Sequence, residues 1–519
     1  MKLRFLLLFS PFLFLFACSN SSSHQEYHPL AESPGPSDED DPLRDSLKQV
    51  FLDQLYFAEE GLNVDSIRHA NRLLHRAIKQ EQRQKANPRS ASEFFANDNI
   101  EAIWHERGPD NEAGDIKIVD YVPSLDRLYA ISSVGHLWRG STAGDDWELL
   151  NDDIQLETNI IRVLPHNGGT RIFACYGAGT EDKEVRYSDD EGVTWTKGTG
   201  FDFYDHWGAA RRLYALSDGQ TLYYLVHTWS ASPWGQLMQI YKSTDKGQTY
   251  SQIVETPVGY ETDEMDMWKP YDSDLLYVID NEAKEYFRIN HNFATGSSSI
   301  STPVSYSNQG IANGRIHVSG RQGSSATRYD LYIYHSSNDN VYKTTNGSNW
   351  TFLSQASDNV WRRGWLADPH NDNLYVGSFQ LNKTTDLINW EEQYDRWWEY
   401  YSVSKDSMHV DIMSLDYFEK SDGTPFITIC NHAGIHITYD HFKTTENLAW
   451  TSLQVTTLYD QTTASDGFLY CGAQDKGTFV YRGNSQADYS ILSTQNTTTG
   501  DGMIGSFFNS DQSYYSMIQ

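Results

Sequence analysis

The stretch RYSDDEGVTWTKG, from Arg186 to Gly198, sets a serine, two aspartates, a glutamate and a glycine ahead of a Thr-Trp pair. Its skeleton is Ser188-x-Asp190-x-Gly192-x-Thr-Trp195. Aspartate side chains accept hydrogen bonds from nearby backbone amides, and glycine takes the positive φ that a tight turn requires. We therefore interpret the acidic cluster as a turn between two strands that its tryptophan covers, and not as a set of catalytic groups.

The skeleton recurs along the chain. The nearest match is Ser243-Thr-Asp245-Lys-Gly247-Gln-Thr-Tyr250. Weaker copies begin at Ser141, Thr344, Thr384 and Thr444, and a degenerate unit at Tyr286–Gly296 fills the one double gap, which makes seven units. The copies start about 40 to 60 residues apart, and this spacing is typical of propeller blades built from four short strands.

The repeats predict the fold class and the domain boundaries. We expect an all-β fold with a seven-bladed β-propeller over residues 100–455. Residues 456–519 are expected to form further blade strands, the start of an incomplete second propeller. A single eight-bladed ring is the alternative.

The repeated turns resemble the Asp-box, or BNR repeat. Other short motifs follow in a matching order, among them Gly108-Pro-Asp-Asn111, Asp368-Pro369, His409-Val-Asp411 and Gly472-Ala-Gln-Asp475. The ordered set covers roughly residues 100–519 and resembles the sortilin/xyloglucanase-like superfamily of secreted bacterial propellers. The resemblance implies that the boxes join the outer two strands of each blade and lie away from the central pocket.

The N-terminus reads MKLRFLLLFSPFLFLFACSN. A basic start and an apolar run too short to span a bilayer are typical of a secretory signal, here residues 1–18. The Leu-Phe-Ala-Cys end resembles a bacterial lipobox, which implies cleavage before Cys18 and lipidation of that cysteine, palmitate included. Because Ser19 follows and not Asp, we expect an outer-membrane lipoprotein, with the leaflet left open. An ordinary signal peptide with an incidental cysteine is the alternative.

Two segments separate this signal from the propeller. Residues 19–42 consist of Ser, Pro, Asp and Glu with almost nothing apolar, which predicts a solvated acidic tether. Residues 43–95 contain two apolar patterns at helical spacing around the break Gly61-Leu-Asn63, which predicts a helical hairpin. Packing on the propeller is the expected use of the hairpin, and a partner-binding arm is the alternative.

Charge and cysteine content narrow the range of partners. Asp and Glu number 70 against 40 Lys and Arg, for a net charge of −30. The electric field of this negative charge repels the phosphate backbones of nucleic acids, so nucleic acid is not an expected partner. Beyond Cys18, the cysteines Cys175, Cys430 and Cys471 lie far apart, and we expect buried thiols and not a disulfide or zinc framework.

Two classes of glycosidase can be compared with the sequence. Sialidases share Asp-boxes but need an arginine triad, and their Arg-Ile-Pro signature precedes the first box; here Phe287-Arg-Ile289 continues with Asn290 in the middle of the ring. In xyloglucanases the first carboxylate lies in Tyr-Ala-x-x-Asp-x-Gly-Gly, and Ser133 stands at that aspartate here. A hydroxyl cannot serve as the general base. The equivalent later stretch, Cys430–Gly434, also lacks the acid, although other acids could have replaced it.

A metal site is the third catalytic candidate. On a strand, His409 and Asp411 would share a face and could reach one ion. The family's pattern continues with another histidine where this chain has Met413. We therefore expect a hydrogen-bonded structural pair or a weak divalent-cation site, and no other cofactor.

Three aromatic-rich loops are candidate ligand-binding surfaces. They contain Trp207, then Trp229 and Trp234, and then Trp397, Trp398 and Tyr400. Flat aromatic side chains beside carboxylates suit sugar stacking and protein hot spots alike. The alternative is that these rings pack between blades.

These observations together predict an envelope-anchored propeller that binds a glycan or an envelope protein without catalysis. One alternative is a glycoside hydrolase that acts on polysaccharide in the propeller cleft. Another is a structural subunit of a secretion or surface assembly.

Overall fold

The computed structural model describes residues 94–95, 103–104, 114–151, 156, 158, 160–175, 184–201, 203, 209–231, 234–258, 264–323, 328–360, 363–393, 408–449, 453–463, 469–475, 477–481, 495–496, 502–508 and 513–518. The chain divides into two compact units, Met1–Asn71 and Arg72–Gln519, and every described residue lies in the second. The predicted signal with Cys18, the tether and nearly all of the predicted helical hairpin lie outside the described residues. The last two residues of the hairpin range, Phe94–Phe95, form strand β1, which pairs with β2 (Ile103–Trp104).

The described residues between 116 and 447 form seven antiparallel sheets, in each of which four strands pair in sequence order. The first sheet consists of β3 (Ile116–Val122), β4 (Arg127–Ser132), β5 (Leu137–Gly140) and β6 (Glu148–Asn151). The second consists of β7 (Ile161–His166), β8 (Gly169–Cys175), β9 (Val185–Ser188) and β10 (Thr196–Lys197). The third consists of β11 (Ala209–Ala215), β12 (Leu222–Ala231), β13 (Trp234–Ser243) and β14 (Ser251–Val258). The next two are β15 (Met265–Trp268), β16 (Leu276–Asp280), β17 (Glu285–Asn292) and β18 (Ser297–Ile300); and β20 (Ile316–Gln322), β21 (Tyr329–His335), β22 (Asn340–Thr344) and β23 (Trp350–Gln355). The last two are β24 (Trp365–Ala367), β25 (Leu374–Gly377), β26 (Leu381–Thr384) and β27 (Glu391–Glu392); and β28 (Ser414–Glu419), β29 (Pro425–Asn431), β30 (Gly434–Thr438) and β31 (Glu446–Asn447).

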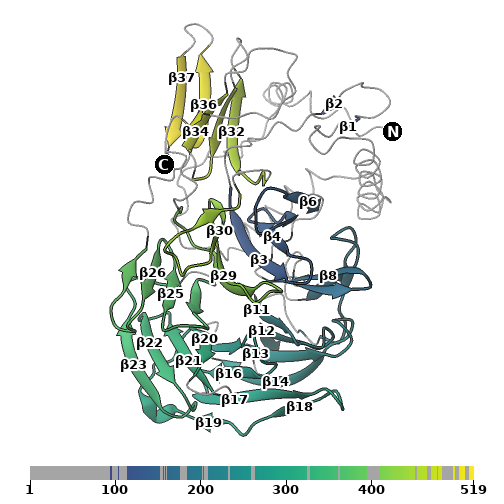
Figure 1. Ribbon diagram of the computed structural model, residues 1–519, viewed down its shortest axis with the longest axis vertical. Helices are drawn as coiled ribbons and strands as arrows, with labels where there is room; N and C mark the ends of the chain where they lie inside the picture. Colours follow the sequence, from purple (N-terminus) through teal and green to yellow (C-terminus); the bar gives the residue numbers. More distant parts are fainter. Residues whose placement is uncertain are drawn as a thin grey trace, which may run out of the picture. The chain divides into compact units, whose positions relative to one another are not determined.

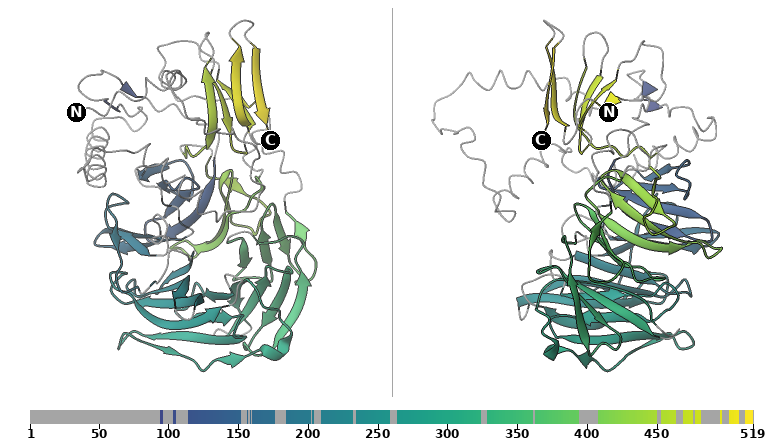
Figure 2. Two further views of the ribbon diagram at one scale, coloured as in Figure 1. Left: turned by 180° about the vertical axis from the view of Figure 1, so that it is seen from behind. Right: turned by 60° about the vertical axis from the view of Figure 1, so that its left-hand side comes forward.

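The sheets follow one another around a closed ring (Figures 1 and 2). The first strand of each sheet contacts the first strand of the next, from β3 through β7, β11, β15, β20 and β24 to β28. Strand β28 then contacts β3 and closes the ring. Radial four-stranded sheets in a closed ring are the architecture of a β-propeller.

Neighbouring sheets cover each other, and this explains the apolar character of the middle strands. Strands β16 and β21 are buried at every position, as expected for strands with both faces covered. The outer strand β23 is exposed at half of its positions. A middle strand of a sheet is therefore mostly apolar along its whole length, whereas an outer strand mixes apolar and polar residues.

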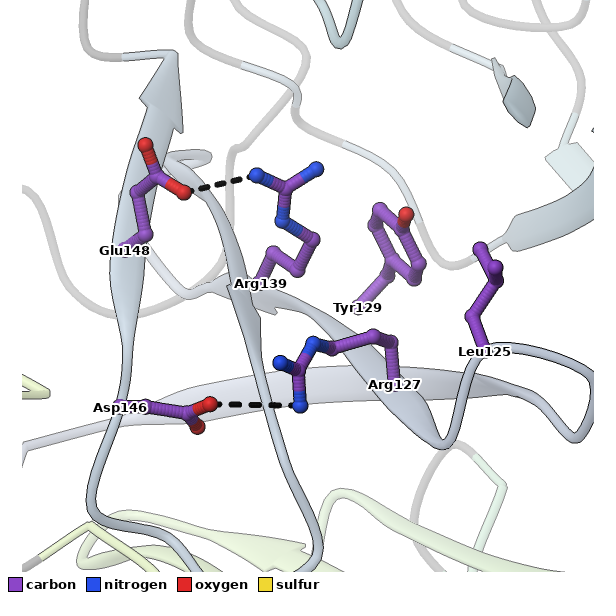
Figure 3. A pocket seen from close by; sticks show the side chains of 6 residues that line it. All are labelled: Leu125, Arg127, Tyr129, Arg139, Asp146 and Glu148. Atoms are coloured by element: carbon purple, nitrogen blue, oxygen red, sulfur yellow. Dashed lines mark hydrogen bonds and ion pairs between the residues drawn. The ribbon is translucent and has the colours of Figure 1, made fainter. Parts of the chain in front are cut away.

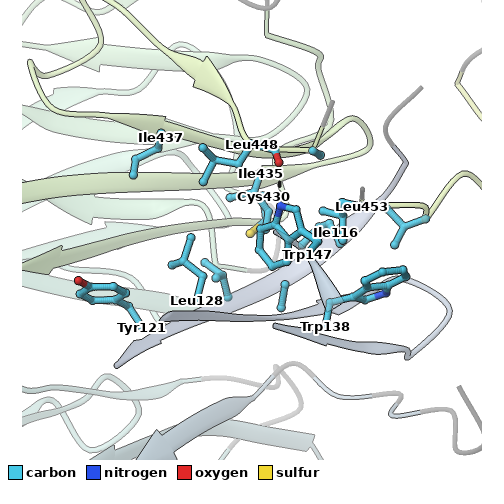
Figure 4. Packing of buried hydrophobic residues seen from close by; sticks show 14 of the residues in the cluster. Ile116, Tyr121, Leu128, Trp138, Trp147, Cys430, Ile435, Ile437, Leu448 and Leu453 are labelled. Atoms are coloured by element: carbon cyan, nitrogen blue, oxygen red, sulfur yellow. Dashed lines mark hydrogen bonds between the residues drawn. The ribbon is translucent and has the colours of Figure 1, made fainter. Parts of the chain in front are cut away.

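Apolar clusters fill the spaces between sheets. One cluster joins the first sheet to the seventh, with Ile116, Leu128 and Trp147 packed against Ile435 and Leu448 (Figure 4). Six further clusters of nine or more buried residues lie in the described part of the ring. The core of this protein is therefore distributed around the ring and is not a single central mass.

Further strands follow the ring. Strands β32 (Leu458–Thr463), β33 (Leu469–Ala473), β34 (Gly477–Tyr481) and β35 (Gln495–Asn496) form another four-stranded sheet in sequence order, and β36 (Gly502–Phe508) pairs with β37 (Ser513–Ile518). Strand β36 also contacts β32 and β33.

Two small elements lie between β18 and β20. Strand β19 (Val304–Ser305) pairs with β17, and the 3-10 helix η2 (Ser307–Gln309) follows it. Among the described residues, no helix has the length and apolar character needed to cross a membrane.

Candidate ligand-binding site

The strand order separates the turns of the ring into two faces. Because successive strands run antiparallel, the turns between the first and second and between the third and fourth strands lie at one end of each sheet. The hairpins between the second and third strands, and the connections to the next sheet, lie at the other end. We call these ends the box face and the hairpin face, since the Asp-box turns join β9 to β10 and β13 to β14.

The first Asp-box is held by a local set of hydrogen bonds. Asp190 Oδ1 accepts hydrogen bonds from Ser188 Oγ at 2.8 Å and from the backbone N of Thr194 at 2.7 Å. The backbone N of Gly192 donates to Ser188 Oγ at 2.8 Å, and Trp195 Nε1 donates to the Gly192 carbonyl at 3.1 Å. The Asp190 carboxylate is thus occupied in holding the turn.

The second box repeats this arrangement. Asp245 Oδ1 accepts hydrogen bonds from Ser243 Oγ at 2.7 Å and from the backbone N of Thr249 at 2.9 Å. The backbone N of Gly247 donates to Ser243 Oγ at 2.9 Å. Gly247 has a φ of 78°, which glycine adopts without steric cost. Tyr250 takes the place of the tryptophan and is buried.

The last box begins at Thr438, earlier than the sequence match at Thr444. Thr438 Oγ1 donates to Asp440 Oδ1 at 3.0 Å and accepts from the backbone N of Phe442 at 3.0 Å. The backbone N of Thr444 donates to Asp440 Oδ1 at 2.9 Å. Phe442 occupies the glycine position with a φ of 66°. Because the glycine is missing, a search for the Ser-x-Asp-x-Gly pattern does not find this copy.

A cavity of about 590 Å³ lies on the hairpin face. Its lining residues come from the starts of first strands and the connections that lead into them, from second-to-third hairpins and from the turn between β33 and β34: Asp115, Lys117, Ser133, Arg315, Val360, Met413, His432 and Gln474. The cavity therefore lies where the ring meets the C-terminal sheet. Its lining mixes polar and apolar groups and carries charges of both signs.

His432, in the hairpin between β29 and β30, lies among three aspartates. Its Nδ1 makes a short hydrogen bond to Asp475 Oδ2 and lies 3.4 Å from Asp411 Oδ2, and its Nε2 lies 3.5 Å from Asp115 Oδ2. Burial alone would lower the pKa of His432, but hydrogen bonds to Asp411 and Asp475 and the charge of Asp115 raise it to about 10. The imidazole therefore carries a proton and a positive charge at neutral pH.

The three aspartates reach His432 from separate parts of the chain. Asp115 directly precedes β3, Asp411 precedes β28, and Asp475 lies in the turn between β33 and β34. Asp411 and Asp475 have φ values of 65° and 52°. Aspartate tolerates this left-handed conformation better than most residues do. The backbone therefore directs both carboxylates from outside the regular strands, Asp475 from a turn and Asp411 from an irregular segment.

The two residues of the predicted metal pair, His409 and Asp411, each have a different neighbour. Asp411 faces His432, whereas the Nδ1 of the buried His409 lies 3.1 Å from the Val410 carbonyl. The two side chains were expected to share a strand face, but residues 408–413 belong to no described strand and Asp411 is left-handed. The alternation of side chains along a strand does not apply to such a segment.

Ser133 lies in the same cavity as His432. It is in the hairpin between β4 and β5, and its backbone N donates to the Asp115 carbonyl at 3.1 Å. The two hairpins that the sequence singled out as lacking a carboxylate therefore meet at one site. They contribute a hydroxyl and an imidazolium to it.

Arginine–aspartate pairs join the inner strands. Arg162 Nη1 lies 2.7 Å from Asp120 Oδ1, Arg212 Nη2 lies 2.8 Å from Asp266 Oδ2, and Arg363 Nη2 lies 3.3 Å from Asp416 Oδ1. Asp120 and Asp266 also accept backbone hydrogen bonds from the next sheet, from Val163 N at 2.6 Å and Val318 N at 2.8 Å. These arginines hold the ring together and are already paired. Arg288, considered for the sialidase signature, lies exposed in the third strand β17.

A second cavity, of about 350 Å³, lies against the first sheet on the box face (Figure 3). Two ion pairs lie along it, between Arg127 Nη1 and Asp146 Oδ2 at 3.2 Å and between Arg139 Nη2 and Glu148 Oε2 at 2.7 Å. Ser133, where the resemblance expects a carboxylate, lines the hairpin-face cavity and not this one, so we consider the hairpin-face cavity the stronger candidate.

The aromatic candidates are only partly described. Trp207, Trp397, Trp398 and Tyr400 lie outside the described residues. Trp229 and Trp234 lie on β12 and β13, where Trp229 is opposite Gln236 and Trp234 is opposite Ala231. Their hairpin joins a second strand to a third, so it lies on the hairpin face. Cys175, Cys430 and Cys471 are buried free thiols, as predicted.

The sequence missed Asp115 and Asp475 as members of the site. Asp475 appeared only within the motif Gly472–Asp475, with no role attached, and Asp115 carried no signal. Their role depends on His432, and no spacing in the sequence links these three positions.

No protein-family model matches the chain, and no curated protein matches it. Among solved structures, the chain is similar to a GH74 enzyme of Niastella koreensis, with 14% identity and a TM-score of 0.50 over 76% of this chain and 63% of that chain. It is also similar to a puromycin hydrolase (8% identity, TM-score 0.44, 73% and 60% covered). A third similar structure is YCF48 bound to D1 peptide (14% identity, TM-score 0.38, 70% and 99% covered). This chain spans about 63% of the length of the GH74 enzyme. Together with the ring of sheets, the first likeness confirms the predicted β-propeller fold.

Proposed function

We propose that the protein is a lipid-anchored bacterial envelope propeller that binds a glycan or an envelope protein on its hairpin face without catalysis. One observation carries this proposal. Ser133, where the resemblance to xyloglucanases expects a carboxylate, and His432, in the later stretch that also lacks the expected acid, line one cavity. The seven sheets support a seven-bladed ring, and β32–β37 supports the start of a second propeller.

The spacing of Asp411 and Asp475, next to this cavity, argues against inverting glycoside hydrolysis by these two carboxylates. Inverting glycosidases hold their two carboxyl groups about 6.5–9.5 Å apart to admit a water molecule. Asp411 and Asp475 each offer an oxygen within 4.8 Å of the other and of His432. With a pKa of about 10, His432 is also a weak general acid at neutral pH. These groups suit charge-assisted hydrogen bonding better than proton transfer.

The position of the aromatic hairpin supports a surface ligand. Trp229 and Trp234 lie on the hairpin face, the face of the cavity. Trp207, Trp397, Trp398 and Tyr400 lie outside the described residues and stay candidate ligand-binding residues. An aromatic hairpin on this face would suit the stacking of sugar rings or a protein hot spot.

The test combines equilibrium binding and reducing-sugar release on one panel of plant and host polysaccharides, using the full chain. We expect binding without release, and weaker binding for Trp229→Ala and Trp234→Ala. Phe352→Ala is the matched control, since Phe352 is an exposed aromatic residue on the outer strand β23. Sugar release from any member of the panel would support the hydrolase alternative instead.

If the panel gives neither binding nor release, the glycan half of the proposal fails. Co-purification from solubilised membranes would then test the protein ligand, and a stable stoichiometric complex would support the alternative of a structural subunit.

A further inference from the structure

We propose that Asp411, His432 and Asp475 form a binding site for one divalent transition-metal ion of the Zn²⁺ or Mn²⁺ type. This inference goes beyond the proposed ligand-binding function and differs from the pair that the sequence suggested. The three side chains each offer one donor atom, and these atoms lie within 4.8 Å of one another.

The chemistry of the donors selects the class of ion. One imidazole nitrogen and two carboxylate oxygens suit Zn²⁺, Mn²⁺ and related ions, because imidazole binds transition metals well. Ca²⁺ and Mg²⁺ take oxygen ligands almost exclusively, so they match this set less well. Two carboxylates and a neutral imidazole carry a charge that balances a divalent cation.

The spacing of the donors is near the geometry of a bound ion. On a tetrahedral ion with bonds of about 2.0–2.1 Å, two donor atoms lie about 3.4 Å apart. His432 Nδ1 lies 3.4 Å from Asp411 Oδ2. Asp475 is closer to the same nitrogen, and a small side-chain rotation would open that contact. Because a metal ligand must be an unprotonated nitrogen, binding releases the Nδ1 proton of His432 to solvent.

Asp115 is placed where it can supply the outer support that metal-bound histidines use. Its Oδ2 lies 3.5 Å from His432 Nε2, on the side of the ring opposite Asp411 and Asp475. A carboxylate that accepts the second N–H of a metal-bound histidine fixes the orientation of the ring and increases its basicity. Asp115 is therefore a positioning residue for the proposed site.

The site would also connect parts of the chain. Asp411 and His432 belong to the last sheet of the ring and its approach, whereas Asp475 belongs to the sheet that follows. The three side chains are partly shielded, with exposures of 15%, 14% and 21% in that order. An ion there would be reachable from solvent and adjacent to the cavity that His432 lines.

The experiment is calorimetric titration of chelator-treated full chain with Zn²⁺ and with Mn²⁺. We expect one ion per chain and at least a tenfold loss of affinity in His432→Gln and in Asp475→Asn. Asp115→Asn should reduce affinity by about tenfold. His370→Gln is the matched control, because His370 also faces a carboxylate, with Nε2 3.3 Å from Glu419 Oε1, and should leave affinity unchanged.

Asn retains the left-handed backbone at positions 411 and 475, so Asp411→Asn and Asp475→Asn test the donors without straining the turns. As a second measurement, the ion should raise the Tm of the wild type, and EDTA should reverse the rise; Asp475→Asn should show neither effect. The proposal is overturned if the wild type binds neither ion at micromolar concentration. It is equally overturned if folded His432→Gln binds as tightly as the wild type, since the cluster would then be an ion-pair clamp only.

Discussion

The pair of Arg212 and Asp266 shows how single side chains stabilise the centre of the ring. Arg212 Nε and Nη2 donate to the two oxygens of Asp266 at 2.9 and 2.8 Å, and Asp266 is completely buried. Burial alone would raise the pKa of Asp266, but the charges of Arg212 and Arg211 hold it below its usual value. Without Arg212, a buried carboxylate would lose its main compensation.

We predict that Arg212→Met lowers the free energy of unfolding by about 3–5 kcal/mol, because breaking one side of a buried pair leaves the other charge uncompensated. Urea unfolding at neutral pH measures this loss. The control is Arg139→Met, whose partners Glu148 and Glu191 are considerably more exposed. It should cost less than about 1 kcal/mol. Equal losses in the two variants would contradict the prediction.

Single residues of the candidate site were the hardest to predict from the sequence. Ser133 and the Cys430–Gly434 stretch could be identified, because the resemblance supplied an expected carboxylate at each. The contact between His432 and Asp475 could not, because it forms between two turns that no local pattern links. The pairing of His409 and Asp411 stays a prediction, but the strand on which it was based is absent at residues 408–413, and Asp411 has a left-handed φ of 65°.

At the scale of elements, the Asp-box turns depend on ionised aspartates. Burial alone would raise the pKa of Asp245, but hydrogen bonds from Thr249, Ser243 and Gln248 lower it. Asp440 in the last box shows the same direction, with Thr444 and Thr438 as donors. A carboxyl group whose folded pKa is depressed adds stability above its unfolded pKa of about 3.9. That stability is lost as the pH falls through the lower folded value.

We therefore predict that Asp245→Asn costs about 1 kcal/mol at pH 5, the usual value of such a hydrogen bond. The difference from the wild type should shrink as the pH falls below about 3.9, because Asp245 is then protonated first in the unfolded chain and, at still lower pH, in the folded protein. Calorimetric Tm values of both proteins at pH 5 and at lower pH measure the change. A difference that stays constant down to the acid limit would show that the charge of Asp245 does not hold the turn.

The repeat in the sequence predicted the elements well where the turn chemistry is explicit. The Ser188 and Ser243 boxes each join the third strand of a sheet to the fourth. The copy near residue 444 was displaced, because Phe442 occupies the glycine position and removes the clearest marker. The predicted helical hairpin lies almost wholly outside the described residues and stays a prediction.

At the scale of the whole molecule, the ring depends on contacts between its first and last sheets. Trp147 Nε1 donates to the Leu448 carbonyl at 2.8 Å, a hydrogen bond that spans 301 residues (Figure 4). Both residues belong to the apolar cluster that joins these sheets. The repeat period predicts how many similar units exist, but closure depends on the angle between neighbouring sheets, which no single repeat encodes.

We predict that Trp147→Phe lowers the free energy of unfolding by about 1–3 kcal/mol, because the Leu448 carbonyl loses its donor inside the buried cluster. We expect this loss of stability mainly where the first sheet contacts the seventh. Amide hydrogen exchange should accelerate in β3 and β28 while β15 and β16, in the fourth sheet, keep their protection. Trp195→Phe is the matched control, because Trp195 Nε1 donates to Gly192 within its own turn. If both variants changed exchange only locally, or if the fourth sheet opened together with the first, the contact would not be the specific closure of the ring.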